Sequence, residues 1–368
     1  MPHLVAIDLP GGDRFVEALQ RIWDAGDAAF PLDRRSPGAA RHALLATIAP
    51  DQLINEQGLH SLDGRGVDEG DALVVATSGT TGSPRGVVLT HDAVVSSARA
   101  TSGRLGVTGD DTWLACLPLS HVGGLSVVMR AIATATRVVV HDGFDVDAVE
   151  GAARQGATLV SLVPTALRRV DASLFRRVVL GGSRPPDQLP ANVVTTYGMT
   201  ETGSGVVYDG YPLDGVEIRV DEAGEIHVRG PMLMRCYRDG TNPVVDGWFP
   251  TGDLGDIAGD GRVAIHGRRG DMIISGGENV WPATVEDVLR VHPRVAEVAV
   301  AGVADLEWGQ RVVAWIVATD ASSPPTLASI RSFAAESLPM YMLPKEIRLV
   351  DSVPTTSSGK VRRQDLPS

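Results

Sequence analysis

The chain has 368 residues, of which 43% are hydrophobic and 21% are charged, and its formal net charge is −12. This length and composition indicate a globular protein of about two domains and exclude a disordered chain. The excess of acidic residues argues against a nucleic-acid-binding protein, which is usually basic.

The sequence indicates neither secretion nor membrane insertion. Its start, from Met1 to Leu4, has no basic segment followed by an apolar one. The longest apolar runs, such as 122–129, are far shorter than the roughly 20 residues that span a bilayer. Two cysteines, Cys116 and Cys236, are too few for a disulfide framework and fit a reducing compartment. We therefore expect a cytoplasmic protein.

Hydrophobic periodicity predicts a helix near the start and then strands that alternate with helices. Apolar residues recur at helical spacing over 15–23. Further along, continuous apolar runs typical of buried strands alternate with helical segments, and this order predicts an α/β fold of stacked layers. Strands are expected at 72–76, 87–89, 112–117, 137–140, 159–163, 178–180 and 193–196, and helices at 91–100, 125–135 and 146–153.

The pattern changes twice toward the C-terminus. Between 216 and 266, short segments alternate apolar with polar residues, which predicts a small antiparallel β subdomain. After Gly267 the pattern predicts a compact α+β unit of about 100 residues. Its helices are expected at 282–289 and 327–337, and its strands near 298–300, 312–317 and 347–350. We expect a large N-terminal domain, 1–269, and a smaller C-terminal domain, 270–368.

The strongest chemical signal follows the strand at 72–76. It reads Thr77-Ser78-Gly79-Thr80-Thr81-Gly82-Ser83-Pro84-Arg85-Gly86. Glycines let the backbone turn tightly and expose its N–H groups, and the hydroxyls and Arg85 add donors and charge, so the loop suits a triphosphate. It lacks the Gly-Lys-Ser/Thr ending of a Walker A loop. A surface loop without a ligand is the alternative.

Two other expected strands end in residues suited to a nucleotide. Leu180-Gly181-Gly182-Ser183 ends one, and Tyr197-Gly198-Met199-Thr200-Glu201-Thr202 follows the other. Ligands bind at the carboxyl ends of strands in open α/β sheets. An aromatic ring, a hydroxyl and a carboxylate could stack a base, contact a phosphate and hold Mg²⁺.

Two later segments carry weaker signals. Asp253 could accept both hydroxyls of a ribose, although by itself this residue is better explained as a turn residue after a glycine. Lys360 ends a run of Ser, Thr and Gly, and it is one of two lysines, with Lys345, among 33 basic residues. That scarcity favours a function for Lys360 over a solvated tail.

Taken together and in this order, these segments resemble the adenylate-forming enzymes, a superfamily that includes the acyl-CoA synthetases. The resemblance runs from about residue 72 to the end of the chain. Three more segments are similar to the o-succinylbenzoate–CoA ligases of menaquinone biosynthesis, in their short form: 118–125, 208–215 and 273–279.

The resemblance implies a two-step reaction whose small-molecule partners are a carboxylic acid, ATP with Mg²⁺, and coenzyme A. The carboxylate attacks the α-phosphate, pyrophosphate leaves, and an acyl-adenylate forms. The thiol of coenzyme A then attacks the adenylate after the C-terminal domain has rotated. The implied fold is a large adenylation domain with a small mobile domain that carries the catalytic lysine.

The resemblance also implies roles for single residues. Lys360 would bridge the carboxylate and the α-phosphate, Thr200 would contact that phosphate, and Glu201 would bind Mg²⁺. Gly270 would be the hinge, while His121 and Ser204 would border the acid. The residues implied to bind ATP or AMP are Thr77, Ser78, Thr80, Thr81, Arg85, Gly181, Gly182, Ser183, Tyr197, Gly198, Asp253 and Arg268, and those implied to line the coenzyme A tunnel are Ser275, Gly276 and Gly277.

This chain departs from the family pattern in three places. Arg85 stands where a lysine is usual, Gly270 stands where Asp or Lys is frequent, and the segment before residue 72 is short. Two alternatives stay open: another acid (aryl or medium-chain, or one loaded onto a carrier protein), and a catalytically silent nucleotide-binding protein. His121 could equally be a packed residue at a helix start, and a second copy of the chain is a candidate partner.

Overall fold

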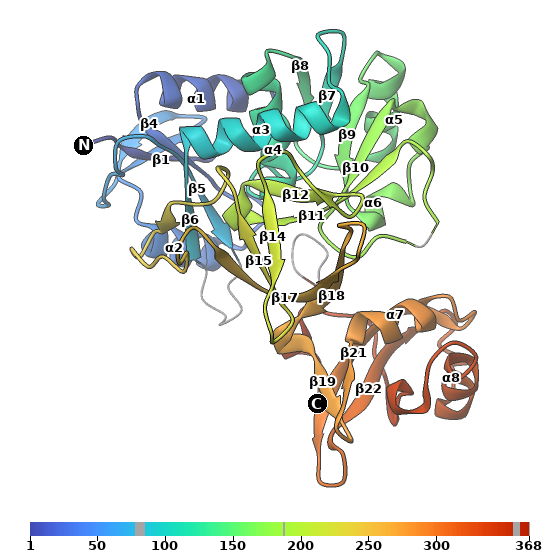
Figure 1. The fold of residues 1–368 in the computed structure, drawn as a ribbon. Helices are drawn as coiled ribbons and strands as arrows, with labels where there is room; N and C mark the ends of the chain where they lie inside the picture. Colours follow the sequence, from blue (N-terminus) through green and yellow to red (C-terminus); the bar gives the residue numbers. More distant parts are fainter. Residues whose placement is uncertain (78–84, 187, 356–360, 368) are drawn as a thin grey trace. The chain divides into compact units, whose positions relative to one another are not determined.

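A computed structural model describes residues 1–77, 85–186, 188–355 and 361–367 (Figure 1). The chain forms two compact units, Met1–Ile218 with Val228–Pro250, and Arg219–His227 with Thr251–Ser368. The division lies at residue 250, so the boundary expected at 269 falls within the second unit. That boundary stays a prediction of where the mobile part begins.

The first unit contains two mixed sheets, as the α/β prediction requires. The first sheet has the order β16-β6-β5-β2-β1-β3-β4 and the second the order β13-β12-β11-β10-β9-β7-β8. The strands of the first are β1 (Leu4–Ile7), β2 (Ala28–Pro31), β3 (Gln52–Asn55), β4 (Gly58–Ser61), β5 (Asp71–Thr77), β6 (Arg85–Thr90) and β16 (Cys236–Tyr237). Those of the second are β7 (Thr112–Ala115), β8 (Arg137–Val140), β9 (Leu159–Leu162), β10 (Arg177–Leu180), β11 (Val193–Met199), β12 (Ser204–Tyr208) and β13 (Tyr211–Pro212).

Two central helices join these sheets. Helix α3 (His91–Leu105) packs on β5 and β6 of the first sheet and on β12 of the second, and α4 (Val122–Thr134) packs on α3, β7, β9 and β12 (Figure 1). Most of α4 is buried, which matches its apolar sequence. The other helices of this unit are α1 (Asp13–Asp24), α2 (Gly38–Ile48), α5 (Val146–Arg154), α6 (Pro164–Leu167) and the 3-10 turn η1 (Ala172–Leu174).

The N-terminal segment folds more regularly than its sequence suggests. The predicted helix is present as α1, but strands β1 to β4 and helix α2 were not predicted. Each of these strands has four residues, too few for a period of two to be recognised. They extend the sheet of β5 and β6, so the short segment before residue 72 belongs to the core of the unit.

The second unit begins with the expected small β-sheet. Its order is β14-β15-β17-β18, and β17 and β18 pair antiparallel. A second sheet follows, β20-β19-β22-β21 with β23 parallel to β22, and α7 and α8 cover its core. Predicted helix 327–337 ends earlier, at Ala334. The elements are β14 (Glu217–Val220), β15 (Glu225–Arg229), β17 (Phe249–Ile257), β18 (Val263–Arg268), β19 (Ile273–Ser275), β20 (Glu278–Val280), α7 (Pro282–Arg290), β21 (Val295–Asp305), β22 (Gly309–Ala318), α8 (Leu327–Ala334) and β23 (Glu346–Leu349).

The described residues also form the short 3-10 turns η2 (Thr200–Thr202), η3 (Arg269–Asp271), η4 (Met340–Met342) and η5 (Arg363–Asp365). Within the described ranges, no helix combines the length and the apolar character that crossing a bilayer would require.

Candidate active site

The two segments that were predicted to bind a nucleotide lie where strands β10 and β11 end. Gly181 follows β10 directly, as expected, but β11 continues through Met199 instead of ending at residue 196. Its last part pairs with β12, and a Cβ atom on Gly198 would lie 2.2 Å from the carbonyl oxygen of Ser204. Glycine is therefore needed at this position for the two strands to approach. Thr200 and Glu201 then form the turn η2.

Tyr237 connects Glu201 to the base of the Ser/Thr/Gly loop. Its hydroxyl donates to Glu201 Oε1 over 2.9 Å, and the guanidinium of Arg85 lies 3.5 Å from the centre of its ring. Arg85 also contacts Thr241 and Asp239. Tyr237 was not predicted from the sequence, because the strand that carries it, β16, has two residues and no motif of its own.

Thr77 and Arg85 form the two ends of the predicted phosphate loop. They are paired residues on the antiparallel strands β5 and β6, and the Thr77 hydroxyl donates to the Arg85 carbonyl over 3.4 Å. The predicted ligands Ser78, Thr80 and Thr81 lie outside the described residues, as does Lys360.

His121 is the N-cap residue of α4 and has an acidic neighbour. Its Nε2 atom lies 3.9 Å from Asp33 Oδ2. Burial alone would raise the pKa of Asp33, but hydrogen bonds and charge from Arg35, with a contribution from His121, lower it below its ordinary value. Asp33 therefore remains ionised beside the imidazole.

Arg130 is a buried cation in α4 that was not among the residues predicted from the sequence. Its side chain donates to Ser204 Oγ over 2.6 Å and to Ser161 Oγ over 3.2 Å. The guanidinium lies 5.3 Å from the centre of the Trp113 ring. Burial lowers its pKa from the ordinary value because a low dielectric penalises the charged form.

The charge of Arg130 has no acidic partner among the residues that the structure describes, and its Nε atom has no hydrogen-bond partner there. A buried charge is costly unless it is paired. The signal in the sequence was an arginine within an otherwise apolar helix. Ser204, which was selected for the acid, is one of the hydroxyls that Arg130 contacts.

Asp253 and Arg268 lie together in the second unit, as the ribose prediction requires. They are paired residues on β17 and β18, and Arg268 Nε lies 2.9 Å from Asp253 Oδ1. Arg268 also donates to the carbonyl of Thr251 over 3.0 Å. The strand pairing fixes both side chains.

The predicted coenzyme A loop is the turn between β19 and β20. Ser275 is buried, and a Cβ atom on Gly276 would lie 2.9 Å from the Trp308 ring. Gly277 has open space at that position. Trp308 therefore restricts the space at Gly276 and not at Gly277. The Lys345 ammonium lies 3.9 Å from the centre of the same ring.

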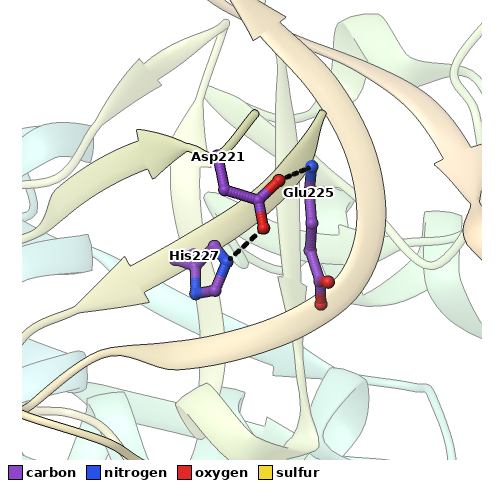
Figure 2. Close-up of side chains that lie close together, drawn as sticks. All are labelled: Asp221, Glu225 and His227. Carbon is purple, nitrogen blue, oxygen red and sulfur yellow. Dashed lines mark hydrogen bonds and ion pairs between the residues drawn. The ribbon is translucent and has the colours of Figure 1, made fainter. Parts of the chain in front are cut away.

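Asp221, Glu225 and His227 form a cluster whose potential ligand atoms lie within 4.8 Å of one another. Figure 2 shows Asp221 contacting both the His227 ring and the Glu225 backbone, while the Glu225 carboxylate extends away from Asp221. That carboxylate accepts from Gly252 N and from Arg269. These contacts support the turn before β15, and we assign the cluster no metal.

Comparison with known proteins gives consistent results over both units. The family described as "AMP-binding enzyme" matches residues 65–238, and "AMP-binding enzyme C-terminal domain" matches residues 284–360. A probable 2-succinylbenzoate–CoA ligase of Mycobacterium tuberculosis is 40% identical over 329 residues, which cover 82% of this chain and 85% of the relative. The 2-succinylbenzoate–CoA ligase of Bacillus cytotoxicus is 36% identical over 334 residues, covering 80% and 69%.

Solved structures agree with these relatives. The o-succinylbenzoate CoA synthetase MenE of Bacillus subtilis, in complex with the acyl-adenylate intermediate OSB-AMP, matches with a TM-score of 0.88 and 29% identity. The match covers 100% of this chain and 88% of that one. The B. subtilis protein has also been solved with ATP and a magnesium ion.

Proposed function

This chain belongs to the AMP-binding enzymes and, within them, to the family of the 2-succinylbenzoate–CoA ligases, and we propose that it ligates 2-succinylbenzoate to coenzyme A. In the first step a carboxylate oxygen attacks the α-phosphorus of ATP, the bond to pyrophosphate breaks, and an acyl-adenylate forms. In the second step the thiol sulfur of coenzyme A attacks the acyl carbon and AMP leaves. The products are 2-succinylbenzoyl-CoA, AMP and diphosphate.

The charge of Arg130, which no acidic side chain pairs among the described residues, is the observation that carries this choice of acid. 2-Succinylbenzoate has two carboxylates, and the reaction activates one of them. The second carboxylate can form the bidentate, charge-assisted hydrogen bonds for which a guanidinium is best suited. A fatty acid or benzoate has a single carboxylate, which the reaction uses, and would leave Arg130 without a partner.

Two further side chains support this assignment. Ser204 Oγ already contacts Arg130, so its hydroxyl would share the bound carboxylate. His121 caps the N-terminus of the helix that carries Arg130 and would border the acid from that end of α4.

Adenylate formation brings two anions together, so positive charge must lie where negative charge concentrates. Lys360 would bridge the attacking carboxylate and the α-phosphate, and Thr200 would donate to that phosphate. The oxygen ligand of Glu201 suits Mg²⁺, which when bound would neutralise phosphate charge. Arg85 and the loop hydroxyls would hold the outer phosphates.

The remaining ligand contacts follow from the position of each motif. The ribose hydroxyls would be bound by Asp253 with Arg268. The adenine and ribose would be lined by Gly181, Gly182, Ser183, Tyr197 and Gly198. Gly277, in the Ser275 to Gly277 turn, would leave room for the thiol arm of coenzyme A. We place the reaction in menaquinone biosynthesis and in the cytoplasm, and a homodimer stays a prediction.

The experiment that tests this function measures CoA-dependent release of AMP from ATP with 2-succinylbenzoate, benzoate and medium-chain fatty acids. A strong preference for 2-succinylbenzoate is the expected result. Turnover of another acid instead would transfer the protein to a different acyl-CoA ligase family. ATP binding with no turnover of any acid would favour the nucleotide-binding alternative.

A further inference from the structure

Arg85 is held on two sides by side chains of one short segment, 237–241. The centre of the Tyr237 ring lies 3.5 Å from its guanidinium carbon. Its Nη2 atom donates to the hydroxyl of Thr241 and lies 3.5 Å from Asp239 Oδ2. The Arg85 side chain is 37% exposed, so these contacts, and not burial in a core, determine its orientation.

Thr241 is oriented to accept a hydrogen bond from Arg85. Its backbone N–H and its hydroxyl both donate to Asp239 Oδ1, over 2.9 and 2.6 Å. These hydrogen bonds, together with the charge of Arg85, lower the pKa of Asp239 below its ordinary value, so the carboxylate stays ionised. Because the hydroxyl hydrogen points to Asp239, the lone pairs of Thr241 Oγ1 face Arg85.

A backbone turn brings Thr241 next to Tyr237. The Tyr237 N–H donates to the carbonyl of Thr241 over 2.8 Å. The N–H of Arg238 donates to the carbonyl of Gly86 over 2.7 Å, directly after Arg85 in the chain. The backbone therefore holds the ring and the hydroxyl on the strand that carries Arg85.

Two arginines anchor the same segment to the first unit. Arg235 forms two hydrogen bonds to Asp71, at 2.8 and 2.7 Å, and Asp71 is 1% exposed. Arg238 donates to the carbonyls of Ile48 and Gly66 over 3.0 and 2.7 Å. Breaking a buried ion pair is costly, so the segment is a rigid support.

The contacts of Arg85 suit a guanidinium better than an ammonium. A planar guanidinium stacks on an aromatic ring and donates in its own plane at the same time. Within the described part of the chain, the hydrogen bond and the ion pair of Arg85 use Nη2, which leaves Nε and Nη1 for an anionic ligand. A lysine would present a single nitrogen atom and no plane to stack.

We propose that Tyr237 and Thr241 are positioning residues that hold Arg85 ready for the outer phosphates of ATP, with Asp239 acting through Thr241. This inference rests on the proposed function, which assigns Arg85 to those phosphates. A cation that is fixed before the ligand arrives loses less conformational entropy on binding. The same contacts explain how an arginine serves where related enzymes usually have a lysine.

The test measures the dissociation constants of ATP, pyrophosphate and AMP by calorimetry, with Mg²⁺ and without acid or coenzyme A. The variants are Thr241→Val, Thr241→Ser, Arg85→Lys and the double variant of Arg85→Lys with Thr241→Val. Ser173→Ala is the matched control, because Ser173 also donates its N–H and its hydroxyl to an aspartate two residues earlier, over 3.0 and 2.6 Å. It belongs to the same unit.

We expect Thr241→Val to weaken binding of ATP and pyrophosphate about fivefold and to leave AMP binding unchanged, since AMP lacks the outer phosphates. Thr241→Ser keeps the hydroxyl and should bind like wild type. Arg85→Lys should also lose about fivefold, and adding Thr241→Val to it should cost nothing further, because a coupled pair is not additive.

The contribution of the ring is isolated by comparing Tyr237→Leu with Tyr237→Phe. Both variants lack the hydroxyl that reaches Glu201, and Tyr237→Phe alone keeps the ring beneath Arg85. Pyrophosphate should therefore bind about threefold more weakly to Tyr237→Leu than to Tyr237→Phe. Equal binding to the two would remove Tyr237 from the positioning of Arg85.

Three other results would overturn the proposal: an equal loss of AMP binding in Thr241→Val, the same loss in Ser173→Ala, or additive losses in the double variant. These measurements need no acid. A wild-type protein that binds ATP and pyrophosphate but does not turn over 2-succinylbenzoate would refute the proposed acid, and the variants would still decide the role of Thr241. A wild-type protein that binds neither would refute both.

Discussion

Arg130 and Arg176 lie in the same unit, but the surroundings of their charges differ. Arg176 forms two hydrogen bonds to the buried carboxylate of Asp111, at 2.8 and 2.6 Å. Arg130 is more deeply buried, yet among the described residues it contacts hydroxyls and an indole ring. A charge whose partner lies in the chain stabilises the fold, and a buried charge without one indicates a ligand.

The largest expected effect is at Lys360, which, like Arg130, is a cation that we assign to binding of the substrates. Lys360→Ala should slow adenylate formation about a thousandfold, because positive charge between the two reacting anions is lost. Thioester formation from supplied acyl-adenylate should be spared. Rapid-quench measurement of both half-reactions tests this.

Lys345→Ala is the matched control, since Lys345 is the other lysine of the chain and lies over Trp308. It should leave adenylate formation unchanged. Equal loss of both half-reactions in Lys360→Ala would remove Lys360 from its assigned role.

The next largest effect is a loss of stability when the ion pair between Arg176 and Asp111 is broken. Asp111→Asn should lower the free energy of unfolding by about 2 kcal/mol, because it removes the partner of Arg176. Urea unfolding measures the loss, and adenylate formation should be unchanged. A large loss of activity with normal stability would show that this pair also serves the ligands.

The same pair predicts a dependence of stability on pH. Burial by itself would raise the pKa of Asp111, but hydrogen bonds from Arg176, Thr158 and Thr108 outweigh it and lower the pKa to about 2. Its stabilisation is complete above about pH 4 and is lost as the pH falls toward 2. Urea unfolding between pH 5 and pH 2.5 should therefore show a smaller decline in Asp111→Asn than in wild type.

A smaller change in the free energy of unfolding is expected when Arg130 is replaced. Arg130→Met should leave the free energy of unfolding unchanged or raise it by about 1 kcal/mol, since an apolar side chain replaces a buried charge that no described carboxylate pairs. Thermal unfolding without ligands provides the measurement. A loss of more than about 2 kcal/mol would mean that Arg130 serves the fold, as Arg176 does.

The smallest expected effect is at Tyr237. Tyr237→Phe removes the hydroxyl that donates to Glu201 but keeps the ring beneath Arg85. Loss of one hydrogen bond should lower the rate of adenylate formation about threefold. Steady-state kinetics at varied Mg·ATP tests this, and an unchanged rate would remove Tyr237 from the site.

Elements and turns could be predicted from the sequence where a hydrophobic pattern and a chemical motif lie in the same short segment. The alternation of strands and helices, the Gly181 strand end and the turn with Glu201 are local features. The resemblance assigned Asp253 and Arg268 to the same ribose, and the structure pairs them on neighbouring strands, but their role stays a prediction. Family membership and the reaction followed from the same segments.

The features that were missed depend on contacts between distant parts of the chain. Tyr237 reaches Glu201 from a two-residue strand, and Arg85 reaches Thr241 across 156 positions. A single arginine in a helix does not reveal whether a carboxylate lies nearby. That no described carboxylate pairs with Arg130 can therefore be recognised only from the structure. Strands β1 to β4 are too short for their pattern to be recognised.

The most direct test of the central claim compares 2-succinylbenzoate with 3-benzoylpropionate, which lacks the ring carboxylate, in wild type and Arg130→Met. We predict that kcat/KM in wild type favours 2-succinylbenzoate by about a hundredfold, as expected for a buried charge pair, and that the preference disappears in Arg130→Met while KM for ATP is unchanged. A preference that persists in Arg130→Met, or an equal loss of activity with both acids, would contradict the assignment of Arg130 to the second carboxylate.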